Sequence, residues 1–197
     1  MGYDGRALTD SDPDIDDVRR IGAGDAAAAA SLVRRRSPRI LALARRMLND
    51  QAEAEDVTQE VFLRVWTHAA NWQPGGAKFE TWLHRVAVNL CLDRLRRRRE
   101  TPAGDALPER PDESPDAEQS LWQNQRAARV RQAIEALPER QRAALELCSF
   151  QELTNIEAAA ALEVSVDALE SLLARARRTL RENLSREVAD LLGAVDG

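Results

Sequence analysis

The chain has 197 residues, of which 44% are hydrophobic and 31% are charged, and its formal net charge at pH 7 is −5. This length allows one domain or two small ones, and the apolar content excludes a chain that is disordered throughout. Glycine, proline and aromatic residues are scarce, whereas alanine, leucine and arginine, which favour helices, are abundant. The composition therefore predicts an all-α fold and leaves little material for a β-sheet.

The sequence predicts neither a leader peptide nor a membrane span. The first residues lack the basic start and apolar core of a signal peptide, and no apolar run approaches the ~18 residues that a span needs. Cys91 and Cys148 lie far apart in apolar stretches, so they predict buried thiols and no disulfide or metal site. We expect a cytoplasmic protein without membrane insertion, metal or cofactor.

The N-terminal half predicts a tail and then a helical domain. Six aspartates and few large apolar side chains make residues 1–22 a flexible acidic tail. Residues 23–100 form the first domain, in which apolar residues recur at helical spacing. We expect its three helices over residues 25–48, 50–70 and 79–99. The third helix runs into a block of arginines at its C-terminal end.

Residues 101–120 separate this domain from a second one. The segment holds four prolines and several acidic residues, which is typical of an extended acidic linker. The second domain follows over residues 121–192. The complete fold class is therefore all-α, with two small helical domains joined by an acidic, proline-rich linker.

A helix-turn-helix is the sharpest motif of the second domain. Thr154 and Glu157 form a capping box that begins a short helix, and Ser165 is a suitable N-cap for a longer one. The longer helix exposes a polar stripe that ends in cations: Glu170, Ser171, Ala174, Arg175 and Arg178. A major groove accepts such a helix, with base edges near its N-terminus and phosphates near its arginines. An ordinary helical hairpin with a solvated arginine face has the same spacing.

Two faces of the first domain are further candidate interfaces. The 50–70 helix gathers an acidic patch with an exposed leucine: Asp56, Gln59, Glu60 and Leu63. This patch suits a protein partner, although the helix dipole also favours acidic residues near a helix N-terminus. The region of the 79–99 helix gathers basic and polar residues: Lys78, Arg85, Asn89, Arg96 and Arg97.

Cations beside Trp72 suit unstacked, single-stranded bases. The sequence favours core or half-buried positions for the tryptophans at 66, 72 and 82 over base stacking. Catalysis is the weakest interpretation, because His68 and His84 have no nucleophile or ligand partner at a recognisable spacing. We predict no catalytic residue.

Four runs of residues together resemble one known family. They are EAEDVTQEVFLRVW from Glu53, FETWLHRVAVNLCLDRLRRR from Phe79, ALPERQR from Ala136 and SVDALESLLARARRTLRE from Ser165. Over about residues 25–100 and 121–185 the chain is similar to an extracytoplasmic-function (ECF) RNA polymerase sigma factor. The resemblance implies sigma region 2 in the first domain and sigma region 4 in the second. It also implies a non-enzymatic protein that directs promoter recognition and transcription initiation.

The resemblance implies a set of partners as well. The acidic patch corresponds to the face that contacts the β′ clamp helices of core RNA polymerase, and region 4 is expected at the β flap. The third helix and the preceding loop correspond to the part that captures the melted downstream promoter element, and the helix-turn-helix to the reader of the upstream duplex. An anti-sigma factor is a further expected partner. The alternative function is a free-standing helix-turn-helix regulator that binds DNA as a dimer.

Three positions depart from the family pattern. Glu152 and Glu163 stand in turns where family members often have glycine, so these turns either avoid positive φ or are strained. Glu170 lies near the start of the recognition helix, where many relatives have basic residues. A carboxylate can accept a hydrogen bond from cytosine N4, so Glu170 is a candidate base reader. The other interpretation is that it points to solvent and balances nearby arginines.

Overall fold

A computed structural model of the chain describes residues 13–72, 78–100 and 128–193, and every regular element in this part is helical. In chain order the elements are α1 (Pro13–Gly22), α2 (Ala26–Leu48), α3 (Gln51–Ala69), α4 (Phe79–Glu100), α6 (Glu139–Leu145), the π-helical turn η1 (Glu146–Phe150), α7 (Asn155–Leu162) and α8 (Val166–Gly193). A further helix covers residues 128–135. The all-α prediction is confirmed, while the predicted linker at 101–120 lies outside the described residues.

The helices of the first domain start and end close to the predicted positions. Asp25 caps α2, because its carboxylate accepts hydrogen bonds from the backbone N–H groups of Ala27 and Ala28. Asp50 caps α3 by accepting from the N–H of Glu53 at 2.9 Å. Asn49, with φ of 50°, ends α2 in the left-handed conformation. Local capping chemistry therefore fixed these boundaries, as the sequence predicted.

The prediction of a flexible tail is wrong for residues 13–22, which form α1. Asp14 is fully buried and accepts hydrogen bonds at 2.7 Å from both Arg35 and Arg36 of α2. Asp17 accepts from Arg35 at the same distance. The apolar side chains of α1 pack into the core: Ile15, Val18 and Ile21. The composition of this segment suggested that its aspartates are solvated. It could not show that arginines 18 to 22 residues later in the chain neutralise them.

The helix-turn-helix is confirmed in α7 and α8. Thr154 and Glu157 form the reciprocal capping box of α7, and the Ser165 hydroxyl accepts from the N–H of Ala168 at 3.1 Å at the start of α8. Glu163 ends α7 with φ of 54°, and Glu152 has φ of 60° before it. Of the two alternatives for these turns, the strained one is present, since a left-handed residue with a Cβ costs about 1–2 kcal/mol.

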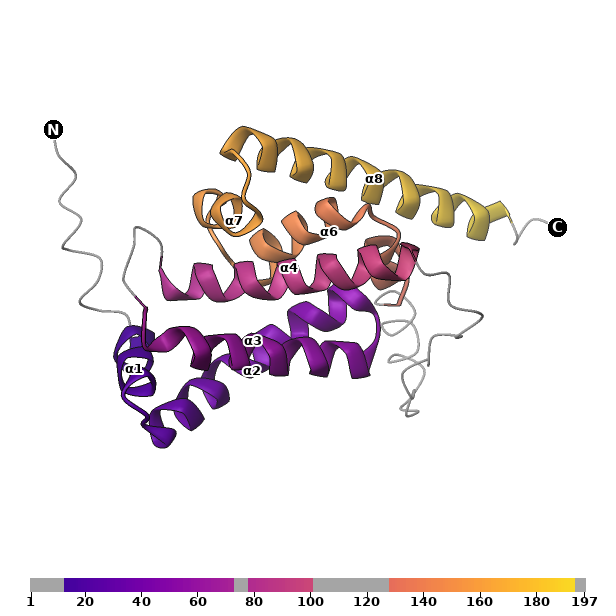
Figure 1. The fold of residues 1–197 in the computed structure, drawn as a ribbon. Coiled ribbons are helices and arrows are strands. Elements are labelled where there is room, and N and C mark those ends of the chain that lie inside the picture. Colours follow the sequence, from indigo (N-terminus) through magenta and orange to yellow (C-terminus); the bar gives the residue numbers. More distant parts are fainter. Residues whose placement is uncertain (1–12, 73–77, 101–127, 194–197) are drawn as a thin grey trace, which may run out of the picture.

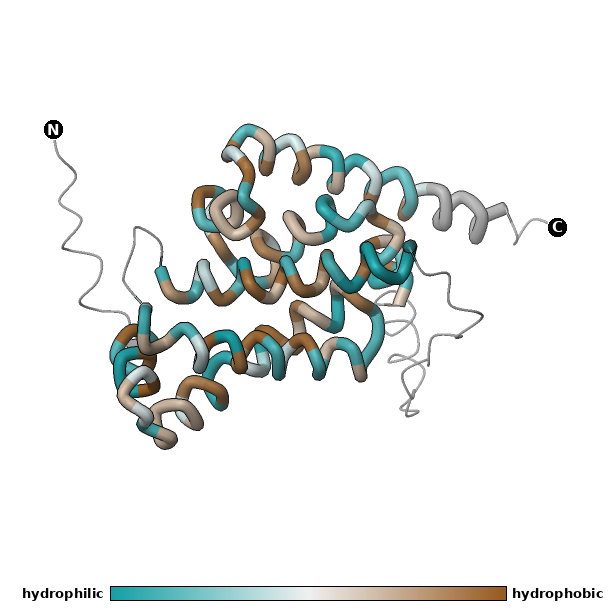
Figure 2. The backbone as a smooth tube through the Cα atoms, in the orientation of Figure 1, coloured by the Kyte–Doolittle hydropathy of each residue, from teal (hydrophilic) through white to brown (hydrophobic). Residues whose placement is uncertain are grey.

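The two predicted domains pack together in this structure. Figure 1 shows α2 and α3 on one side of α4, with α6, α7 and α8 on the other. The larger cluster of buried apolar residues runs from Val18 in α1, through Leu83 in α4, to Leu173 in α8. Figure 2 shows hydrophobic and hydrophilic residues alternating along the coloured parts of the helices, as amphipathic helices require. Helix α4 contacts α2 and α3 on one side and α7 on the other, and it forms the centre of this arrangement.

Candidate nucleic-acid and partner interfaces

The polar stripe of α8 faces solvent along its whole predicted length. All five stripe residues are exposed: Glu170, Ser171, Ala174, Arg175 and Arg178. The opposite side of α8 is buried through Leu169, Leu173 and Ala176. The amide of Asn155 donates to the Glu170 carboxylate at 3.2 Å, so α7 orients this side chain. A polar helix face backed by a rigid apolar one is suited to insertion into a major groove.

The acidic patch on α3 also faces solvent, opposite the buried Val57, Val61 and Val65. Asp56 and Gln59 are exposed, Glu60 is half-buried, and 54% of Leu63 is accessible. Trp66 is 44% exposed and extends the patch by one helical turn. Sequence reasoning considered this tryptophan for a core position, but its spacing of seven residues from Gln59 could have placed it on the patch.

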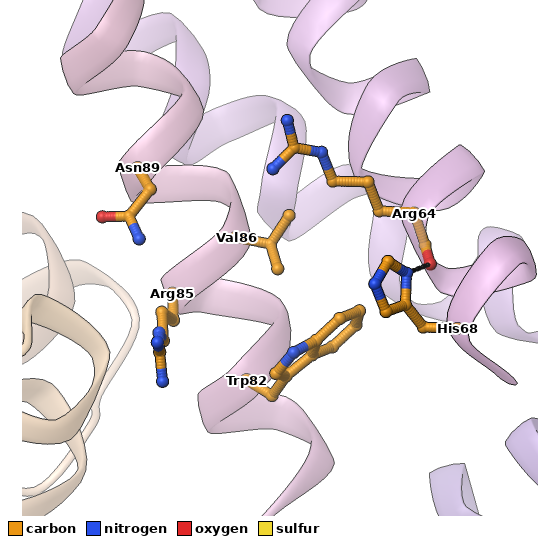
Figure 3. Close-up of a pocket in the computed structure, with 6 residues that line it drawn as sticks. All are labelled: Arg64, His68, Trp82, Arg85, Val86 and Asn89. Atoms are coloured by element: carbon orange, nitrogen blue, oxygen red, sulfur yellow. Dashed lines mark hydrogen bonds between the residues drawn. The ribbon is translucent and has the colours of Figure 1, made fainter. Parts of the chain in front are cut away.

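A pocket of about 270 Å³ opens between α3 and α4. Figure 3 shows its lining: Arg64, His68, Trp82, Arg85, Val86 and Asn89. Arg85 and Asn89 were predicted site residues, whereas Arg64 and His68 come from α3 and were missed. The His68 ring is held by a hydrogen bond of 2.9 Å between its Nδ1 and the Arg64 carbonyl oxygen. The pocket thus combines two cations, an amide and an aromatic face, which suits a nucleic-acid base and its phosphates.

Ring contacts show how Trp72 and Trp82 pack in the fold. Trp72 packs edge-on against Phe79 and Trp82, with ring centroids 5.3 and 5.1 Å apart. Both tryptophans are half-buried in this aromatic cluster. The cluster favours the core alternative for Trp72, and it fixes the Trp82 ring at the wall of the pocket.

Two of the predicted cations on the α4 side are paired with carboxylates of α7. The Lys78 amine lies 2.8 Å from the Glu157 carboxylate, and the Arg85 guanidinium pairs with Glu163. Partial burial raises the pKa of Glu157, but hydrogen bonds from Lys78 and Thr154 outweigh it and hold the pKa below its usual value. Arg96 pairs with neighbours on its own helix and Arg97 is exposed.

A buried polar network joins the two domains and was not predicted. Arg46 of α2 donates two hydrogen bonds of 2.6 Å to the carboxylate of Glu146, a residue that is only 2% exposed. Gln151 donates to the same carboxylate at 2.9 Å and its amide oxygen lies 3.3 Å from His84 Nε2. Arg142 donates to the Met47 carbonyl oxygen at 2.7 Å. No local pattern could find contacts between residues 67 to 100 positions apart.

The described part of the chain offers neither a metal-binding cluster nor a membrane-spanning helix. It contains no cluster of three or more histidine, cysteine, aspartate or glutamate side chains placed to hold a metal ion. None of its helices combines the length and the apolar character that crossing a membrane demands.

Both domains of the chain are similar to known proteins. Residues 32–101 match Sigma-70 region 2, and residues 127–180 match Sigma-70 region 4. The ECF RNA polymerase sigma factor SigE of Mycolicibacterium smegmatis is 39% identical over 85% of this chain and 66% of its own length. The ECF RNA polymerase sigma factor RpoE of Cereibacter sphaeroides is 32% identical over 82% of this chain and 88% of its own.

A solved structure gives the same result for the fold. CnrH, in complex with the cytosolic domain of CnrY, superposes with a TM-score of 0.68 and 25% identity, over 89% of this chain and 99% of CnrH. Because a free-standing helix-turn-helix regulator has no sigma region 2, that alternative is wrong. The chain belongs to the ECF RNA polymerase sigma factors, non-enzymatic proteins that direct transcription initiation.

Proposed function

We propose that this sigma factor divides four contacts among separate surfaces. The acidic patch of α3 binds the β′ clamp helices of core RNA polymerase, and region 4 contacts the β flap. Lys78, the pocket on α4, and Arg96 and Arg97 hold the melted downstream element, while the α8 stripe reads the upstream duplex. One observation carries this assignment: the exposed acidic patch and the exposed cationic stripe lie on different elements, so polymerase and DNA can be bound together.

Docking on polymerase is tested by reversing charge on the α3 patch. Asp56→Arg combined with Glu60→Arg should lower affinity for core polymerase about 100-fold, because like charges across an interface cost several kcal/mol. Both side chains lie outside the Val57–Val65 core stripe, so the helical circular dichroism signal should stay unchanged. Asp16→Arg, exposed on α1, is the control and should bind normally. Undiminished co-purification of the double variant with polymerase contradicts the docking assignment.

The downstream assignment is tested at the step where DNA melts. Asn89→Ala should slow promoter opening more than it weakens the closed complex, since single-stranded bases become available only after melting. Permanganate reactivity of promoter thymines measures opening, and a premelted template should restore part of the rate. Normal opening by Asn89→Ala and by Arg85→Ala shows that this face does not handle the open strand.

We further infer that the protein acts in the cytoplasm and that an anti-sigma factor binds it. RNA polymerase and promoter DNA are cytoplasmic, and the structural neighbour CnrH is bound by the cytosolic domain of another protein. Co-purification from its native host, with and without the inducing condition, tests this partner. A factor that elutes with polymerase alone under every condition contradicts it.

A further inference from the structure

Both ends of helix α7 make ion pairs with the proposed downstream-element surface. Glu157 stands in its first turn and pairs with Lys78, while Glu163 at its C-cap pairs with Arg85. Helix α7 also packs directly on α4. The two carboxylates thus occupy two of the cations that are proposed to hold the melted strand.

A cation held by a carboxylate is less available to a phosphate. Lys78 and Arg85 have side chains that are 58% and 47% exposed, so their ion pairs with α7 are weak and can be displaced by a competing anion. The α8 stripe differs in this respect. Its described hydrogen bonds stay within the second domain, such as that from Asn155 to Glu170. The same arrangement therefore covers one proposed DNA surface and leaves the other open.

The buried network explains why α7 stays at this place. Glu146 is almost fully buried, and its charge is neutralised by Arg46 from the other domain. The guanidinium of Arg46 also lies 4.6 Å from the ring centroid of Phe150, and Arg142 reaches across to Met47. None of these side chains belongs to the proposed polymerase or DNA surfaces. Separating the domains would break this network and expose the apolar cluster that they share, so the closed arrangement has its own stabilising core.

We propose that this closed arrangement is an autoinhibited state of the free sigma factor, in which Glu157 and Glu163 occupy the sites of promoter phosphates. Capture of the melted strand then requires α7 to leave Lys78 and Arg85. This inference rests on the proposed function of α4 and adds how that surface is regulated within the same chain. It predicts direct competition between α7 and single-stranded DNA.

The first test uses the single lysine of the chain, Lys78. A carbodiimide joins an amine to a carboxylate only when the two are in contact, so the free full-length chain should give a Lys78–Glu157 cross-link in mass spectrometry. Glu157→Gln removes the carboxylate but keeps a capping-box side chain, and should abolish the product. Absence of the cross-link in the unmodified free chain overturns the inference, whatever the polymerase experiments show.

The second test measures competition with a fluorescein-labelled single-stranded DNA 15-mer of random sequence. Glu157→Gln with Glu163→Gln should bind this probe about three- to tenfold more tightly than the wild type, the range expected for two exposed ion pairs. Saturating probe should also suppress the cross-link of the wild type. Glu152→Gln is the matched control, because Glu152 is an exposed glutamate with positive φ that has no ion pair among the described residues.

The outcomes separate this inference from the proposed function. Equal affinities in wild type and double variant, or an equal gain in the Glu152→Gln control, overturn competition by α7. If the double variant binds more tightly but Asn89→Ala and Arg85→Ala both open promoters normally, α7 competes with DNA while the downstream role of α4 is wrong.

Discussion

Helices α4 and α8 carry similar cationic faces, yet their surroundings differ. On the α4 side, Lys78 and Arg85 are paired with carboxylates of another domain. On α8, Arg175 and Arg178 are exposed on a stripe whose described hydrogen bonds stay within the second domain. The comparison teaches that a cationic helix face does not define an available binding surface. Availability depends on whether remote acidic side chains reach the same cations.

The largest expected effect comes from breaking the buried network that joins the two domains. Arg46→Ala leaves Glu146 buried without its cation, so the free energy of unfolding should fall by about 3 kcal/mol. Urea unfolding followed by circular dichroism measures this change. Arg45→Ala, exposed on the same helix, should change stability by less than about 0.5 kcal/mol. Equal stabilities for both variants mean that the network does not hold the domains together.

A second prediction sharpens the comparison on the open α8 stripe. Glu170→Ala should change the preferred upstream sequence, because a good base contact contributes about 1–3 kcal/mol to discrimination against the wrong base. Arg178→Ala should weaken all promoters alike and reduce the salt dependence by about one phosphate contact. Selection of functional promoters from a randomised upstream element compares the two variants. Identical consensus sequences for wild type and Glu170→Ala show that this carboxylate reads no base.

A third prediction concerns the strained turn before α7. Glycine adopts positive φ without a Cβ penalty, so Glu152→Gly should raise the free energy of unfolding by about 0.5–1 kcal/mol. Thermal unfolding measures the gain. Glu152→Ala keeps a Cβ and is the control, with no gain expected. Similar stabilities of the two variants show that the turn stores no strain.

The smallest effect is a change in thiol chemistry at the domain contact. Burial, aided by Glu146 and Glu53 and opposed by Arg94, raises the pKa of Cys91 to about 12. Its thiol should therefore resist Ellman's reagent at pH 8, whereas half-buried Cys148 should react first. Because this pKa is raised above the unfolded value of 9.0, its contribution to stability is complete below pH 9 and is lost as pH rises toward 12. Arg46→Ala should speed labelling of Cys91, and fast labelling in the wild type contradicts a tightly closed contact.

Local patterns explain why so much of the fold was predicted. Asp50, Thr154 and Ser165 cap helices within three residues of themselves, so sequence neighbours suffice to place α3, α7 and α8. The buried side of α3 follows the same helical spacing, with Val57, Val61 and Val65 four residues apart. The first helix was missed for the opposite reason. Its buried Asp14 is satisfied only by arginines of α2, which are distant in sequence.

The candidate sites likewise divide into those set by neighbouring residues and those that need residues distant in sequence. The exposed positions of the α3 patch and the α8 stripe follow from the angle of each residue around its own helix, which periodicity gives directly. The pocket required residues of two helices, so Arg64 and His68 could not be assigned to it before α3 and α4 were packed together.

The sequence by itself determined the all-α class, most helix boundaries and the sigma-factor family, because capping, amphipathic spacing and motif order are properties of neighbouring residues. Only the tertiary structure decided that α7 covers α4 and that α8 stays open. The ion pair of Arg85 with Glu163 spans 78 residues and that of Arg46 with Glu146 spans 100. Such pairs depend on how two amphipathic domains bury a shared apolar face, and that choice is made by the packing of the whole chain.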